Sequence, residues 1–66
     1  MTDEEIISAL LERLQSALSQ VDRALTINDT EDEEAIREVE NTTRYLEAFG
    51  LSDREIMDRV QALNKQ

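Results

Sequence analysis

Residues 6–25 read IISALLERLQSALSQVDRAL, and this stretch decides the fold. Its apolar residues recur at alternating steps of four and three, which is typical of a helix that packs against other helices along its whole length. A second apolar column, Leu10, Ala17 and Ala24, lies beside this seam and includes small residues that allow close helix approach. We predict that the helix packs on partner helices through Ile7, Leu10, Leu11, Leu14, Leu18, Val21 and Leu25.

The middle of this stretch carries no charge between Arg13 and Asp22, although 35% of the chain is charged. A helix with one exposed side normally has charged residues on that side. We therefore expect this segment to contact neighbouring helices on more than one side.

The composition limits both the fold and the chemistry. The chain has 66 residues, enough for one domain over residues 1–66 and close to the lower limit for folding alone. It has no cysteine and no histidine, which excludes disulfides and the usual zinc sites. The absence of proline, a single glycine and 3% aromatic residues favour an all-α fold with short connections. Small chains of this kind are commonly stabilised by self-association.

Three predicted helix starts share one signature, a serine or threonine followed by glutamate three residues later. In such a capping box, the hydroxyl accepts a hydrogen bond from a free amide in the first turn of the helix. The three boxes are Thr2/Glu5, Thr30/Glu33 and Ser52/Glu55. Together with the apolar periodicities, they predict helices over residues 3–27, 31–49 and 53–64.

The predicted connections contain residues suited to turns. Asn28 and Asp29 tolerate the backbone conformations that end a helix, and Gly50 fits the left-handed position after the second helix. The inner face of the second helix is thinner than that of the first. We assign Tyr45 and Phe49 to the wide end of the core, in preference to a recognition pair.

The helix lengths predict a helical hairpin plus a short third helix. The third helix is about half as long as the first, so it can cover only part of the first helix's apolar face. A second copy of the chain can cover the rest, either by antiparallel pairing of the first helices or by packing hairpin on hairpin. We therefore expect a homodimer, with a monomeric three-helix bundle as the alternative.

Residues 29–40 contain seven acidic residues and one basic residue. Carboxylates at a helix N-terminus are stabilised by the positive end of the helix dipole, which accounts for residues 31–34. Glu38 lies past the first turn, at a repulsive i,i+4 spacing from Glu34. The run is either a solvated helix surface or a face that binds a basic partner, for which the candidates are Glu31, Asp32, Glu34 and Glu38.

Two motif-like patterns fail in their details. If residues 29–40 are read as a calcium-binding loop, Glu34 occupies the position of the required glycine. Residues 49–56 are similar to the turn of a helix-turn-helix unit, but the second helix begins Asp53-Arg54-Glu55, and acidic residues there oppose phosphate. A simple helix–helix connection is the better interpretation.

Charge and residue content define the expected class of function. Sixteen acidic and seven basic residues leave a net charge of −9, which opposes direct binding to nucleic acid. We expect no membrane segment, no signal peptide and a cytoplasmic location. No histidine is present to activate a serine, and no glycine-rich phosphate loop exists, so we expect no enzyme, cofactor or metal site.

The leading hypothesis is a small acidic protein–protein interaction module, an adaptor, chaperone or regulator that acts through a helical face. The alternative is a charge-based mimic of nucleic acid that inhibits a basic nucleic-acid-binding protein. The general layout resembles that of small helical-hairpin regulators and secretion chaperones, and no residue motif identifies a family.

Overall fold

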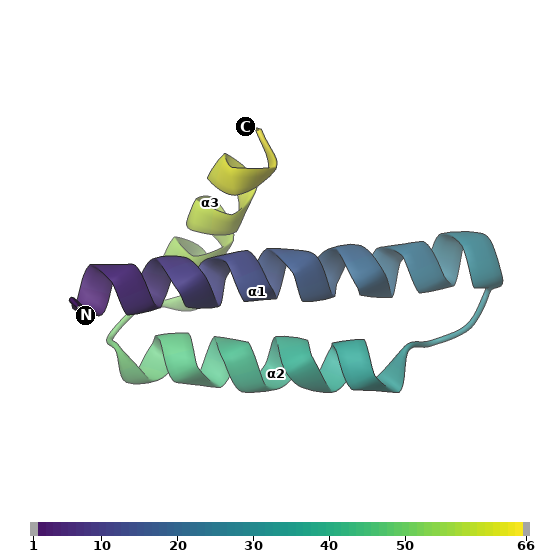
Figure 1. Cartoon of the computed structure of the whole chain (residues 1–66), viewed down its shortest axis with the longest axis horizontal. Helices are drawn as coiled ribbons and strands as arrows, with labels where there is room; N and C mark the ends of the chain where they lie inside the picture. The colour runs from purple at the N-terminus through teal and green to yellow at the C-terminus, as the bar shows by residue number, and fades with distance from the viewer. Residues whose placement is uncertain (1, 66) are drawn as a thin grey trace.

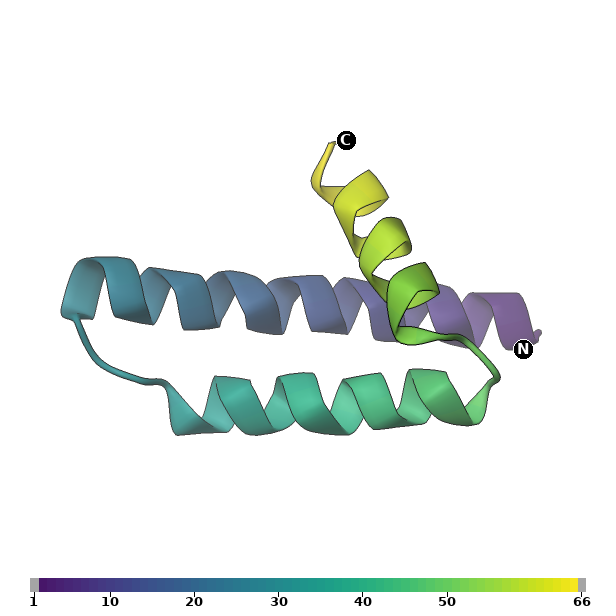
Figure 2. The same ribbon diagram turned by 180° about the vertical axis from the view of Figure 1, so that it is seen from behind.

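The computed structural model describes residues 2–65, which form three α-helices and no strands. Helix α1 (Asp3–Arg23) and helix α2 (Glu33–Ala48) run antiparallel as a hairpin, and α3 (Asp53–Asn64) crosses α1 steeply and projects beyond it (Figure 1). Seen from behind, α3 crosses α1 within the half nearer the N-terminus and does not reach the other half (Figure 2). The predicted fold, a helical hairpin plus a short third helix, is confirmed.

Helix α1 ends in one wider turn, the π-helix η1 (Ala24–Asn28). The backbone N–H groups of Asp29 and Thr30 both donate to the carbonyl of Ala24, with 3.2 Å between Thr30 N and that oxygen. Asp29 has a φ of 52°, in the left-handed region that ends helices, as its turn chemistry predicts. The first helix therefore ends close to the predicted residue, although its last turn is not α-helical.

Two of the three predicted helix caps are present. Thr2 Oγ1 accepts from the N–H of Glu5 at 3.3 Å, and Ser52 Oγ accepts from the N–H of Glu55 at 3.2 Å. The prediction of Thr30 as the cap of the second helix was wrong. Helix α2 begins at Glu33, and Asp32 Oδ1 accepts from the N–H of Ala35 at 3.1 Å. Aspartate is favoured over threonine as an N-cap, and here it displaces the start of the helix by two residues.

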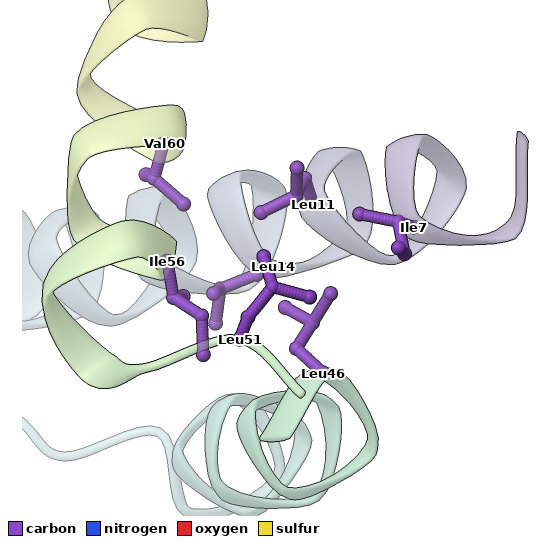
Figure 3. Packing of buried hydrophobic residues seen from close by; sticks show 7 residues of the cluster. All are labelled: Ile7, Leu11, Leu14, Leu46, Leu51, Ile56 and Val60. Atoms are coloured by element: carbon purple, nitrogen blue, oxygen red, sulfur yellow. The ribbon is translucent and has the colours of Figure 1, made fainter. Parts of the chain in front are cut away.

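The core lies where α3 crosses the hairpin. Seven buried apolar side chains meet there (Figure 3): Ile7, Leu11 and Leu14 from α1, Leu46 from α2, Leu51 from the connection, and Ile56 and Val60 from α3. Nearer the η1 end, the buried residues are the small Ala17, Ala24 and Ala35. The hairpin is therefore thick at the α3 end and thin at the η1 end.

Tyr45 and Phe49 are not part of this core. Their exposed fractions are 63% and 40%, so the prediction that placed them in the core was wrong. Leu46 takes the inward position between them and is fully buried. Because the chain turns at Gly50, Leu51 closes the end of the core in place of Phe49.

The turn at Gly50 has the hydrogen bonds of a Schellman motif. The N–H of Gly50 donates to the carbonyl of Glu47 at 2.9 Å, and the N–H of Leu51 donates to the carbonyl of Leu46 at 3.4 Å. Gly50 has a φ of +95°, and a Cβ added there would meet no atom within 4 Å. The need for glycine is therefore a matter of backbone conformation alone.

Replacing Gly50 with alanine should lower the free energy of unfolding by about 1–2 kcal/mol, because an L-residue is strained at this φ. Gly50→Asn should lower the free energy of unfolding by less, since asparagine tolerates left-handed conformations better than alanine does. Urea denaturation, monitored by circular dichroism, measures the free energy of unfolding of both variants. An alanine variant as stable as the parent would contradict the left-handed conformation of this turn.

Candidate functional site

The seven predicted packing residues of the first helix, six in α1 and Leu25 in η1, fall into two groups. Ile7, Leu11 and Leu14 are buried inside the chain, where α2 and α3 already cover them. The other four keep solvent-exposed surface: Leu10, Leu18 and Val21 are half-buried, and Leu25 is 49% exposed. The part of the seam that remains open to a partner therefore lies mainly toward η1.

An apolar groove lies beside α3 and receives side chains from all three helices. Its volume is about 210 Å³, and it is lined by Leu14, Leu18, Val39, Thr43, Asp53, Ile56 and Met57. Leu14 and Ile56 are buried, whereas Met57 is 49% exposed. The groove thus has a fixed floor and a flexible, accessible edge.

Apolar side chains continue from this groove toward η1. Val21 of α1 and Leu25 of η1 follow the groove residue Leu18 at helical spacing. On α2, Ile36 lies one turn before the groove residue Val39. All five are at least partly exposed. We name these five residues the apolar flank.

A second, polar cleft lies between α1 and α2 and has a volume of about 340 Å³. Three of the four predicted acidic residues line it, Asp32, Glu34 and Glu38, so the structure brings them together. Glu31 is exposed and is not among the lining residues. The other residues lining the cleft are Arg13, Ser16, Ala17, Gln20 and Ala35.

Glu38 forms an ion pair with a residue of the other helix of the hairpin, which the spacing along α2 does not indicate. Arg13 of α1 donates to Glu38 Oε1 from Nη2 at 2.6 Å and from Nε at 3.1 Å. Because both side chains retain considerable exposure, the pair contributes about 0.2–1 kcal/mol. It nevertheless offsets the repulsion expected between Glu34 and Glu38.

Asp32 also has a structural role, because its carboxylate caps α2. Glu34 lies in the first turn of α2, where the positive end of the helix dipole stabilises its carboxylate. Glu31 is therefore the member of the predicted acidic face for which residues 2–65 provide no such role. This makes the acidic face smaller than the sequence indicates.

Several groove residues were not among the predicted site residues, namely Val39, Thr43, Asp53, Ile56 and Met57. The i, i+3, i+7 spacing of Ile36, Val39 and Thr43 marks a second column on α2 that faces this side. That spacing was a usable signal. The direction in which α3 leaves the hairpin, which completes the groove, has no comparable signal in the sequence.

Within residues 2–65, no group of three or more aspartate or glutamate side chains is arranged to hold a metal ion. Over the same range, no helix combines the length and the apolar character needed to cross a membrane. Comparisons with protein-family models, curated proteins and solved structures find no match. Function must therefore be inferred from the two surfaces themselves.

Proposed function

We propose that this protein is a small, acidic, non-enzymatic interaction module, an adaptor, chaperone or regulator that binds another protein through the apolar flank. The observation that carries the proposal is the exposed apolar surface that these side chains keep, from the groove beside α3 toward the η1 end of the hairpin, which α3 does not reach (Figure 2). Contiguous exposed apolar side chains commonly mark protein–protein interaction sites.

The total exposed surface supports this proposal. The chain exposes 5062 Å². A compact monomer of 7.6 kDa is expected to expose about 4,300 Å². The excess is close to the surface of about 800 Å² that each partner buries in a standard protein–protein interface.

In the isolated protein, the available partner is a second copy, and we propose that the chain forms a homodimer through the apolar flank. Replacing Leu18 or Leu25 with aspartate should abolish dimer formation, because an unpaired charge would be buried in the interface. Leu25→Asp is the cleaner variant, since Leu25 is the more exposed of the two and its replacement should leave the fold intact. Sedimentation equilibrium at micromolar concentrations, with circular dichroism for helix content, measures both properties.

Ile27→Asp provides a matched control. Ile27 belongs to η1, is 70% exposed and lies outside the apolar flank, so this variant should dimerise like the parent. A parent protein that sediments as a monomer with full helix content would contradict the homodimer. Loss of dimer in Ile27→Asp alone would place the interface elsewhere.

The alternative function, a charge-based mimic of nucleic acid, is favoured by one observation: Asp32, Glu34 and Glu38 surround the same cleft. Changing Glu34 and Glu38 together to glutamine should leave folding nearly unchanged, because only one weak ion pair is lost. If the cleft binds a basic protein, this double variant should capture it more slowly, and the difference should shrink in high salt.

Comparison of two variants separates the two proposals. In pull-downs from the source cell, Leu25→Asp should lose partners held by the apolar flank, and the double glutamine variant should lose partners held by charge. Glu38→Gln alone is the control for loss of the ion pair with Arg13. If only the double glutamine variant loses its partner, the charge mimic replaces the interaction module as the better proposal.

A further inference from the structure

The groove beside α3 is lined mainly by apolar side chains and receives them from all three helices. Leu14 and Ile56 form a buried floor, and Leu18 and Val39 add apolar surface from the two helices of the hairpin. Grooves of this kind receive the apolar face of an amphipathic helix, whose side chains at i, i+3 or i+4, and i+7 enter as anchors. Met57 at the edge can adapt its flexible side chain to such an anchor.

The charges around the groove are mainly negative. One carboxylate lines it, and three more lie one helical turn from a lining residue. These four residues are Asp53, Asp22, Glu40 and Glu47. Arg54 and Arg59 occupy comparable positions on α3, but Arg59 lies 3.7 Å from Glu4 in an ion pair. The net field at the groove, like that of the whole chain at −9, therefore favours a cationic partner.

We infer that the groove beside α3 binds a basic amphipathic helix of a partner protein, with apolar side chains in the groove and lysine or arginine residues toward the surrounding carboxylates. The inference rests on the proposed interaction function and names the chemistry of the partner. A second copy of the chain carries the same charge of −9 and is repelled by it. Because Leu18 belongs to both the groove and the apolar flank, the basic helix should displace the second copy from a homodimer.

Three fluorescent peptides provide the test. The first is a helical peptide with leucine at i, i+3, i+4 and i+7 and lysine at the remaining positions. The second has the same leucines with glutamate in place of lysine, and the third has the composition of the first in an order that forms no apolar face. Fluorescence anisotropy measures their affinity for the full chain at low and at physiological salt, and sedimentation shows whether the first peptide dissociates the dimer.

Two variants link binding to the groove. Met57→Gln removes an exposed apolar side chain at the groove edge, so it should lower the affinity for the basic peptide about fivefold or more. Ile27→Gln removes an apolar side chain that is more exposed and lies outside the groove, so its affinity should match that of the parent. Melting curves confirm that both variants fold like the parent.

The inference is supported if the basic amphipathic peptide binds more tightly than the other two, and if its binding is weaker in salt and depends on Met57. It is overturned if the acidic or the reordered peptide binds equally well, if Met57→Gln has no effect, or if the homodimer persists with excess peptide. In the last case the second copy is the occupant, and the proposed interaction function stands. If no peptide binds and the chain is also monomeric, both the inference and the proposed use of the apolar flank fail.

Discussion

Replacing Leu46 with alanine should lower the free energy of unfolding by about 2–5 kcal/mol, because a cavity would remain at the centre of the core. Leu46 is 0% exposed and belongs to the cluster with residues of α1, α3 and the connection between α2 and α3 (Figure 3). At about 0.05–0.15 kcal/mol per residue, a chain of 66 residues has a total stability of about 3–10 kcal/mol. The variant should therefore melt at least about 10 °C below the parent or be partly unfolded at room temperature.

The neighbouring residue provides a control for this prediction. Tyr45→Ala removes a larger side chain from the same helix, but Tyr45 is mostly exposed, so the free energy of unfolding should change by about 0.5 kcal/mol or less. Thermal melts by circular dichroism measure both variants. Similar losses for the two would mean that α2 faces the core with a different side.

Features set by short stretches of sequence were predicted well. The caps at Thr2 and Ser52, the left-handed turns at Asp29 and Gly50, and the bounds of the third helix all depend on neighbours within one or two turns. The small residues Ala17 of α1 and Ala24 of η1 are buried, as expected of residues that allow close helix approach. Local hydrogen bonding and backbone preference decide such features, and both can be read from residue order.

Errors arose where two local preferences competed. Thr30 and Asp32 are both suitable N-caps, and the carboxylate of Asp32 takes that role. Phe49 continues the apolar spacing of α2, but the turn at Gly50 follows directly and brings Leu51 into the core instead. Periodicity alone does not indicate which of two apolar residues next to a turn will be buried.

The candidate surfaces depend on how the helices are placed, and residue spacing along one helix does not determine this. The partners Arg13 and Glu38 are separated by 25 residues in the sequence and meet because α1 and α2 are antiparallel. The groove needs α3 to cross the hairpin near one end (Figure 2), so that Met57 lines it together with Leu18 and Val39. From sequence, the apolar face of α1 and the α2 column with Val39 and Thr43 could be recognised, but the wall that α3 adds to the groove could not.

Replacing Ile56 with alanine should have the second-largest effect, because this residue anchors α3 to the hairpin. Ile56 is buried in the core and also forms part of the groove floor. We expect a loss of about 2–5 kcal/mol in the free energy of unfolding. Helix α3 has 12 residues, and helices of this length are marginal in water without packing. Hydrogen exchange should therefore show the largest loss of protection in α3.

The neighbour Met57 separates anchoring from binding. Met57→Ala truncates a half-exposed side chain, so it should leave the protection of α3 close to that of the parent while weakening the basic peptide. Ile56→Ala should lose both the protection of α3 and the binding of the basic peptide, because a detached α3 removes one wall of the groove. If Ile56→Ala destabilises α3 but binds the peptide as well as the parent, the binding site is formed by the hairpin alone. The uncovered apolar flank of α1 and α2 would then be sufficient to hold a partner helix.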